Sequence, residues 1–239
     1  MKFAIISAGE GSRLSQEGIR VPKPLVQLNG VPMIDRLIRI FAENGADEVA
    51  VIINNEVPQT REHLERLQKM SAVPLRVVRK TTPSSMHSFY ELSRYLKEDR
   101  FCLTTVDTVF REDEFARFIE AFKASDKDGM MAVTDYIDDE KPLYIGTDDR
   151  LRITGFYDAA MPDTKYISGG IYCLTPKAID TLEYCIGHGM SRMRNFQRQL
   201  VADGLRLEAC PFSKILDVDH AGDIVKAEAF LNGKSNEMQ

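Results

Sequence analysis

Paired cysteines are missing from this 239-residue chain. Its four cysteines lie far apart and none belongs to a Cys-x-x-Cys pair, which argues against a disulfide framework or a redox motif. We therefore expect reduced and mostly buried thiols. The four histidines have no metal-ligand spacing, so a structural zinc site is not expected either.

Long apolar runs are missing as well. No segment approaches the run of about 20 apolar residues that a membrane-spanning helix needs. The short apolar run at the amino terminus is interrupted by Glu10 and Arg13 before a signal-peptide core could form. The sequence also has no linker, internal repeat or low-complexity segment. These absences predict a cytoplasmic protein that has no membrane partner and folds as one domain.

Positive charge is the minority charge in this chain. The 31 Lys and Arg residues are outnumbered by 36 Asp and Glu residues, which gives a net charge of -5. A protein with this balance is not expected to bind nucleic acid over its whole surface. Charged residues at 28% and hydrophobic residues at 44% are ordinary for a soluble globular protein. Any affinity for phosphate must come from a local cation cluster, which favours a small phosphorylated substrate.

Short apolar runs alternate with amphipathic helical patterns along most of the chain. Because strands joined by helices require crossover connections, this alternation predicts a parallel sheet. The pattern weakens at 136–166, which is rich in Asp, Gly and turn signals and which we interpret as a substrate-side insertion on the same sheet. The pattern predicts strands at 3–6, 48–53, 75–78, 101–106, 130–134, 151–156, 166–174 and 205–210, and helices at 33–44, 60–70, 85–96, 113–124, from 176 onward, 192–203 and 222–231.

The loop after the first strand carries two glycines, Gly9 and Gly11, with Arg13 and Lys23 close behind them. Glycine lets the backbone approach an anion and present successive N–H groups to it, and the two cations add full charges. A dinucleotide-binding fingerprint is excluded because Leu14 stands where its third glycine belongs. A P-loop is excluded because its Gly-Lys-Ser/Thr ending is absent. The loop therefore predicts another kind of phosphate chemistry.

A third pattern matches this segment. The chain resembles the nucleotidyltransferases that activate sugar 1-phosphates and related phosphorylated alcohols, in which a strand leads into Gly-x-Gly-Ser/Thr-Arg-Leu, then Pro-Lys-Pro/Ala-Leu, then Gly-x-Pro-Met/Leu. The matching residues are, in order, Gly9, Gly11, Ser12, Arg13, Leu14, Pro22, Lys23, Pro24, Leu25, Gly30, Pro32 and Met33. The resemblance extends over nearly the whole chain.

This resemblance implies a fold as well as an activity. The expected fold is a single-domain, three-layer α/β/α sandwich with a Rossmann-like, mostly parallel mixed sheet. The domain would occupy residues 1–239, with a nucleotide-binding half at 1–110 and an acceptor-binding half at 111–239. The expected activity is transfer of a nucleoside monophosphate from a nucleoside triphosphate to a phosphorylated acceptor, with release of pyrophosphate.

The resemblance also assigns roles within the phosphate loop. The residues it assigns to the triphosphate are Ala8, Gly9, Gly11 and Ser12. Arg13 would steady the departing pyrophosphate, and Lys23 would lie against the α-phosphate. No general base is needed, because an acceptor phosphate, with a second pKa of about 6, is already largely ionised at pH 7.

Two regions supply carboxylates for a magnesium ion, the implied cofactor. Asp107 follows the strand at 101–106, at the carboxyl edge where ligands of open α/β sheets bind, and it matches the family's first metal ligand. The resemblance places the second ligand near the end of the chain, where Asp217 and Asp219 are both available, and we favour Asp219. Asp223 is expected to serve the amino terminus of the last helix.

The family's base-binding segment is altered in this sequence. The stretch at 81–89 lacks the family's Gly-Thr-Ala, which favours a cytidylyl or uridylyl transfer over a deoxythymidylyl or guanylyl transfer. Ser85 and Ser88 are candidate nucleotide contacts. A helix N-cap at Ser84 or Ser85 is an equally good interpretation of these serines.

The acceptor side is represented by Gly169 and Gly170, in a segment that resembles the family's Asn-x-Gly-Ile-Tyr strand. Paired glycines in a strand allow a ligand to approach closely, but they also occur at β-bulges. Lys165 is a candidate contact to the acceptor phosphate. The Glu-Lys-Pro of many hexose 1-phosphate enzymes is absent, so the acceptor need not be an ordinary hexose.

Two other functions remain as alternatives. A glycosyltransferase of the similar GT-A fold would bind a nucleotide sugar through an Asp-x-Asp motif, whereas here Asp107 is followed by Thr108 and Val109. A catalytically silent nucleotide sensor would bind without transfer, although the retained Arg13 and Lys23 argue against it.

Overall fold

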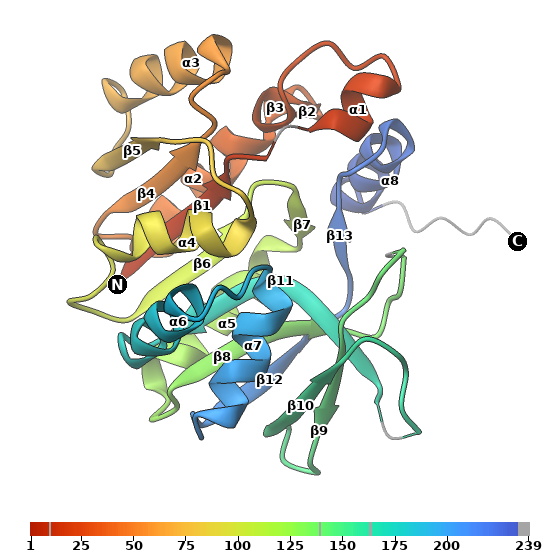
Figure 1. The fold of residues 1–239 in the computed structure, drawn as a ribbon. Helices are drawn as coiled ribbons and strands as arrows, with labels where there is room; N and C mark the ends of the chain where they lie inside the picture. The colour runs from red at the N-terminus through yellow and green to blue at the C-terminus, as the bar shows by residue number, and fades with distance from the viewer. Residues whose placement is uncertain (10, 139, 163, 234–239) are drawn as a thin grey trace, which may run out of the picture.

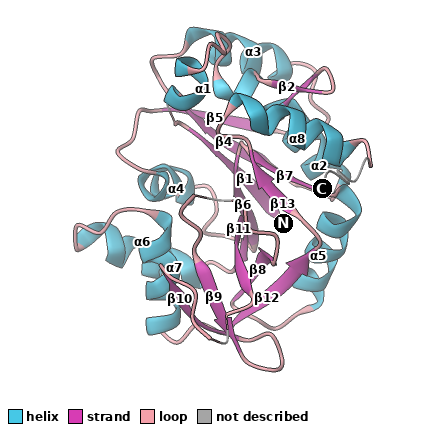
Figure 2. Ribbon diagram, turned by 90° about the vertical axis from the view of Figure 1, so that its right-hand side faces the viewer, coloured by secondary structure: helices cyan, strands magenta, loops and turns pink. Residues whose placement is uncertain are grey.

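A nine-stranded mixed sheet runs through the molecule, with helices on both of its faces (Figure 1 and Figure 2). The computed structural model describes residues 1–9, 11–138, 140–162 and 164–233; Glu10, in the predicted phosphate loop, lies outside the described residues. The sheet consists of β1 (Lys2–Ser7), β4 (Val49–Ile53), β5 (Leu75–Arg79), β6 (Phe101–Thr105), β8 (Gly129–Thr134), β9 (Tyr144–Thr147), β10 (Ile153–Tyr157), β11 (Tyr166–Leu174) and β12 (Leu207–Phe212). The strand order is β10-β9-β11-β6-β1-β4-β5, with β8 paired to β11 and to β12.

Most strands of this sheet point the same way. β1 is parallel to β4 and β6, β5 is parallel to β4, and β12 is parallel to β8. β11 is antiparallel to β6, β8 and β9, and β10 is antiparallel to β9. β10 and β11 therefore run opposite to the other strands, which gives the mostly parallel mixed sheet that the sequence predicts.

Two hydrophobic cores fill the space between the sheet and its helices. Alternate residues of a strand point to opposite faces, so Phe3 and Ile5 of β1 enter one core and Ala4 and Ile6 enter the other. The first core is covered mainly by α2 (Met33–Glu43) and α5 (Glu112–Ala124), and the second by α4 (Ser85–Ser93), α6 (Lys177–Gly187) and α7 (Met193–Ala202). The three-layer sandwich predicted from the sequence is thus confirmed.

Several short elements were not expected from the sequence. They are α1 (Ser12–Gln16), the 3-10 helix η1 (Lys23–Leu25), the small sheet of β2 (Gln27–Leu28) and β3 (Val31–Pro32), the small sheet of β7 (Thr108–Phe110) and β13 (Ile215–Asp217), and β9 within the segment expected to be irregular. Each is too short to produce a periodic pattern. The remaining helices, α3 (Pro58–Gln68) and α8 (Ala221–Leu231), lie where the pattern predicts them.

The cysteines are as expected from their spacing. All four are free, and Cys102, Cys173 and Cys185 are buried while Cys210 is half-buried. Burial raises the pKa of the Cys210 thiol to about 11, so it is protonated at neutral pH. In the part of the chain that the structure describes, no helix has both the length and the apolar character to cross a membrane.

Candidate active site

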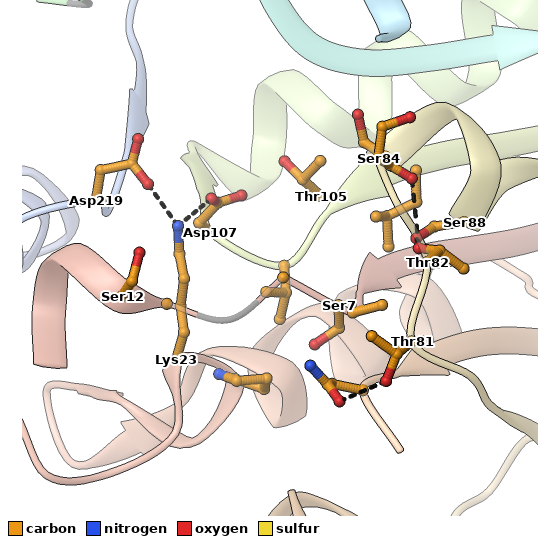
Figure 3. A pocket seen from close by; sticks show the side chains of 18 of the residues that line it. Ser7, Ser12, Lys23, Thr81, Thr82, Ser84, Ser88, Thr105, Asp107 and Asp219 are labelled. Atoms are coloured by element: carbon orange, nitrogen blue, oxygen red, sulfur yellow. Dashed lines mark hydrogen bonds and ion pairs between the residues drawn. The ribbon is translucent and has the colours of Figure 1, made fainter. Parts of the chain in front are cut away.

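The carboxyl ends of β1, β4 and β6 open into a cleft of about 530 Å³, the first cleft (Figure 3). The chain leaves these three strands at Ala8, Asn54 and Val106, and all three residues line the cleft. Neighbouring parallel strands end at the same edge of a sheet, so residues far apart in the sequence meet here. The residues predicted to hold the triphosphate, Ala8, Gly9, Gly11 and Ser12, all line this cleft.

Gly11, at the start of α1, occupies a position that favours glycine. Its φ is 62°, in the left-handed region that side chains disfavour. A Cβ atom built on Gly11 would also lie 2.9 Å from Cβ of Lys23. Gly9 is different, because its φ is not positive and no described neighbour lies within 4 Å of a Cβ built there. Gly11 therefore lets Lys23 pack directly against the phosphate loop.

Lys23 is the centre of an ion-pair network that joins three segments of the chain (Figure 3). Its ammonium group pairs with Asp107 and lies 2.6 Å from Oδ1 of Asp219. Arg13 Nη1 lies 2.8 Å from Oδ2 of the same Asp219 carboxylate. Burial alone would lower the pKa of Lys23, but the two carboxylates outweigh burial and hold that pKa above its usual value. Lys23 is therefore a fixed positive charge in the cleft at neutral pH.

The same two carboxylates fit a divalent cation. Oδ1 of Asp107 is buried and has no hydrogen-bond partner among the described residues. Magnesium prefers oxygen ligands and is usually held by one or two carboxylates together with substrate phosphates. Asp107 and Asp219 provide that donor set, with one buried oxygen still unused. The described residues contain no group of three or more His, Cys, Asp or Glu side chains that would form a complete metal site without substrate.

Asp217 and Asp219 lie in different surroundings. Asp217 ends β13, opposite Thr108 of β7, and of the two clefts described here it lines only the second one below. Asp219 contacts the ammonium group that also holds Asp107, so the structure brings Asp219 to the candidate metal position. Asp223 accepts a hydrogen bond from the backbone N–H of Asp219 at 3.2 Å, and so serves the amino terminus of α8, as expected from the sequence.

Hydroxyl groups gather at the other end of the first cleft, away from Lys23 (Figure 3). Ser88 is buried, and its Oγ lies 2.6 Å from Oγ1 of Thr82. Thr81 Oγ1 donates to Oδ1 of Asn54 at 3.0 Å. This end of the cleft therefore offers uncharged hydrogen-bonding groups, whereas the other end offers charges.

The structure shows which serine occupies the N-cap position of α4. Ser84 occupies the N-cap position, but its Oγ lies 2.9 Å from Nδ1 of His87 instead of capping a backbone N–H. Ser85 is the first residue of α4 and lines the first cleft. Ser85 and Ser88 are therefore both placed at the cleft, although Ser88 already has a hydroxyl partner.

Three polar residues of the first cleft were missed in the sequence: Ser7, Asn54 and Thr105. Ser7 and Thr105 end β1 and β6, and Asn54 directly follows β4. The buried Oγ of Ser7 has no hydrogen-bond partner in the described part of the chain. The rule that ligands bind at the carboxyl edge of a parallel sheet would have pointed to Ser7 and Asn54, which directly follow predicted strands, but not to Thr105, which lies within the predicted strand at 101–106.

A second cleft, of about 470 Å³, adjoins the first. Arg13 and Asp219 line both clefts, so the ion-pair network stands at the junction between them. The wall of the second cleft is formed by residues of β8, β11, β13 and the start of α8, among them Thr134, Gly169, Asp217 and Lys226. These elements belong to the half of the chain that was predicted to bind the acceptor.

The paired glycines combine the two interpretations drawn from the sequence. The register between β11 and β8 shifts between Ser168 and Tyr172, so the pair does mark a bulge. Gly169 also lines the second cleft. Gly170 has a φ of 72°, and a Cβ atom there would lie 3.3 Å from Oγ1 of Thr108. A Cβ atom built on Gly169 would overlap Cδ1 of Ile215, so the absence of a side chain there allows close packing against β13.

Lys165 lies away from both clefts. Its side chain is 65% exposed and pairs loosely with Asp135 at 4.0 Å. Its ammonium group also lies 5.1 Å from the ring centre of Tyr166. Among the residues that the structure describes, Lys165 lines neither cleft, so the geometry does not bring it together with the other predicted site residues.

Comparisons with known proteins agree on one class of protein. The MobA-like NTP transferase domain matches residues 3–202. The bifunctional IPC transferase and DIPP synthase of Rubrobacter xylanophilus is 24% identical, over 96% of this chain and 52% of that protein. The glucose-1-phosphate cytidylyltransferase of Salmonella typhimurium is 23% identical, over 77% of this chain and 78% of that protein. The structure of the inositol-1-phosphate CTP transferase from T. maritima has a TM-score of 0.81 at 17% identity, covering 100% of this chain and 97% of that one.

The fold and the family match together place this chain in the nucleotidyltransferase class of proteins. The chain belongs to the MobA-like NTP transferase domain family, whose model covers most of its length. The resemblance to sugar-phosphate nucleotidyltransferases is thereby confirmed, and the T. maritima structure shows that the fold is shared. The chain spans about half the length of several curated relatives that it matches. The family match ends before Asp217 and Asp219, so it does not itself cover those two residues.

Proposed function

We propose that this chain transfers a nucleoside monophosphate from a nucleoside triphosphate to a phosphorylated alcohol of the sugar 1-phosphate type, with release of pyrophosphate. The observation that carries the proposal is the junction of the two clefts, where Lys23, Arg13 and Asp219 meet. Two phosphorylated substrates bound in adjoining clefts would present their phosphates to each other at this point. The cations at the junction would neutralise the charge that otherwise keeps the two phosphates apart.

The first cleft is the proposed donor site. The triphosphate would lie on the backbone of Gly9, Gly11 and Ser12, and the base would point toward the hydroxyls at Thr81–Ser88. Ser85 and Ser88 are proposed nucleotide contacts there. A pyrimidine nucleotide, CTP or UTP, is the proposed donor, because the segment at 81–89 lacks the Gly-Thr-Ala of deoxythymidylyl and guanylyl enzymes.

The reaction is an in-line displacement at the α-phosphorus. An oxygen of the acceptor phosphate forms the new P–O bond, the bond to the bridging α,β-oxygen breaks, and its electron pair leaves with pyrophosphate. Lys23 would stabilise charge at the α-phosphate, and Arg13 would stabilise the leaving pyrophosphate. No side chain needs to remove a proton, because the acceptor oxygen is already ionised.

Asp107 and Asp219 are the residues that would hold a magnesium ion, with Asp217 nearby in the second cleft. When bound, the ion neutralises phosphate charge. The Lys23 ammonium, which contacts both carboxylates in this structure, would then find new partners in the phosphate oxygens. Gly169 is proposed to line the acceptor site, Gly170 to shape it, and Lys165, which lies outside both clefts, to contact the acceptor phosphate.

The proposal is tested by pyrophosphate release, measured with magnesium over four nucleoside triphosphates and a panel of sugar 1-phosphates, phosphocholine and phosphorylated polyols. We expect turnover with at least one pair and its loss on chelation of the metal. Lys23→Met and Arg13→Ala should each lower the rate by about a hundredfold or more. Lys97→Met, which removes an exposed lysine that pairs with Glu183, is the matched control.

Three outcomes would count against this proposal. No pyrophosphate with any pair would reject the enzyme and leave a nucleotide sensor. Transfer from a nucleotide sugar without pyrophosphate would instead support a glycosyltransferase. A Lys23→Met protein with normal melting and an undiminished rate would overturn the role of Lys23. Arg13 is about half exposed, so Arg13→Ala keeps the test decisive if loss of Lys23 unfolds the chain.

A further inference from the structure

The start of α8 is held by two carboxylates from opposite ends of the chain. Asp223, within α8, accepts hydrogen bonds from the backbone N–H groups of Asp219 at 3.2 Å and His220 at 2.9 Å. Glu17, just after α1, accepts one from the N–H of Ala221 through Oε2 at 2.6 Å, and its Oε1 lies 2.5 Å from Nδ1 of His220. N–H groups at a helix start lack partners within the helix, and negative charge is favoured there. Glu17 is therefore a cap supplied by a distant segment.

Glu17 and Arg13 reach the same segment from one side of α1. They are four residues apart, close to one helical turn. Arg13 contacts the Asp219 carboxylate, and Glu17 contacts the N–H of Ala221. The stretch at 12–17 is thus joined to the stretch at 219–221 at two points, although about 200 residues separate them in the sequence. One of these two contacts is made by Arg13, which is itself a predicted catalytic residue.

The Asp219 segment and helix α1 differ in how firmly other parts of the chain hold them. The Asp219 segment is fixed by the pairing of β13 with β7 and by the N–H of Val218, which donates to the carbonyl of Asp107 at 3.1 Å. Helix α1 has only five residues, with Leu14 as its buried residue. A helix this short is not stable through its own hydrogen bonds. Tertiary contacts therefore decide where Arg13 lies: Leu14 holds the middle of α1 in the first core, and Glu17 holds its carboxyl end.

We propose that Glu17 is a positioning residue, which fixes α1 against the start of α8 and so holds Arg13 at the junction of the two clefts. This inference rests on the proposed function. Of the described residues, Glu17 lines neither cleft, so it acts through Arg13 and not on a substrate. Removing its carboxylate frees the carboxyl end of α1. A displacement of a catalytic group by about 1 Å can cost about a hundredfold in rate.

The test is a double-mutant cycle of Glu17→Ala and Arg13→Ala, read as kcat and KM for pyrophosphate release with the best substrate pair. We expect Glu17→Ala to lower kcat by about ten- to a hundredfold. In the Arg13→Ala background the same change should have little further effect, because the group that Glu17 positions is gone. Glu17→Gln should keep most of the rate, since its amide oxygen can still accept from Ala221. Additive losses, or an unchanged kcat in Glu17→Ala, would overturn the proposal.

Glu114 offers a matched control. Its carboxylate accepts from the N–H of Ser213 at 2.9 Å and from the Ser213 hydroxyl at 3.0 Å, a similar link between distant segments. Glu114→Ala should lower the melting temperature to a similar degree and leave kcat unchanged. Loss of kcat in both variants would make Glu17 a general stability contact and reject its positioning role.

Failure of the proposed function would look different from failure of this inference. A wild-type chain that releases no pyrophosphate would reject the function. The cycle is then read by calorimetric titration with CTP and UTP. Non-additive losses of affinity would support the role of Glu17, and additive or absent losses would reject it.

Discussion

At the scale of single residues, the phosphate loop depends on the backbone conformation of Gly11. Its left-handed φ turns the chain into α1, and the missing side chain leaves room for the stem of Lys23. Lys23 then extends to Asp107 and Asp219 and forms ion pairs with both. One glycine thus connects the loop conformation with the placement of a cation.

We expect Gly11→Ala to lower the free energy of unfolding more than Gly189→Ala does. Both glycines have positive φ, 62° and 69°, so alanine meets similar strain at each, about 1–2 kcal/mol. At Gly11 the new Cβ would also press on Lys23, whereas no described neighbour lies within 4 Å of a Cβ at Gly189. Urea denaturation measures both losses, and pyrophosphate release should fall in Gly11→Ala alone. Equal losses of stability with equal activity would show that the contact with Lys23 is unimportant.

Residues of the site could be predicted where a motif marked them. Arg13, Lys23 and Asp107 follow from motif spacing and from the end of a predicted strand, and the structure brings them into one cleft. Ser7 and Asn54 directly follow predicted strands, but that position alone does not show that they share a cleft. They become part of a site only because the ends of β1 and β4 lie side by side. That neighbourhood depends on strand order, which no local pattern contains.

At the scale of elements, the long helices and strands were predictable and the short ones were not. Periodicity located β11, yet it carries no information on direction, and β11 is antiparallel to β6. The two-stranded sheet of β7 and β13 escaped prediction because each strand has three residues. That small sheet brings the segment of Asp219 to Asp107, so part of the site geometry depends on elements too short to recognise in a sequence.

The burial of β11 makes a prediction about alkaline pH. Tyr172 is 6% exposed, and burial raises the pKa of its phenol to about 12. In the unfolded chain the phenol ionises near pH 10, so above about pH 10 the unfolded state binds fewer protons than the folded state and stability falls as pH rises. Relative to the wild type, Tyr172→Phe should gain about 1.4 kcal/mol in free energy of unfolding between pH 8 and pH 11.

Urea titrations of the wild type and Tyr172→Phe at both pH values measure this gain. The difference at pH 8 contains the loss of the hydrogen bond from Gln197 Nε2, which lies 3.4 Å from the phenol oxygen. That loss is present at both pH values, so only the change between them reports on ionisation. A difference that stays constant would contradict a buried, neutral phenol.

At the scale of the whole molecule, the two predicted halves share one sheet. β11, from residues 111–239, lies beside β6, from residues 1–110, with Ile171 opposite Thr104 and Leu174 opposite Phe101. The cores are shared too, since Ile171 and Phe212 pack in the same cluster as Phe3 and Phe110. The last helix, α8, returns to the first half, where Glu228 accepts from the N–H of Asn29 at 2.9 Å. The two predicted halves are therefore not separate folding units.

This continuity predicts that neither half is stable alone. A fragment of residues 1–110 would expose the edge of β6 and lose the part of the first core that α5, β8 and β11 provide, while a fragment of residues 111–239 would lose the other side of that edge. We expect the full chain to unfold in one calorimetric transition whose van't Hoff and calorimetric enthalpies agree. Each fragment alone should show no cooperative transition, and mixing the two should restore one, because the β6–β11 pairing can form between separate chains. Two resolved transitions in the full chain, or a sharp transition in either fragment, would mean that the sheet is two folding units joined at β6 and β11.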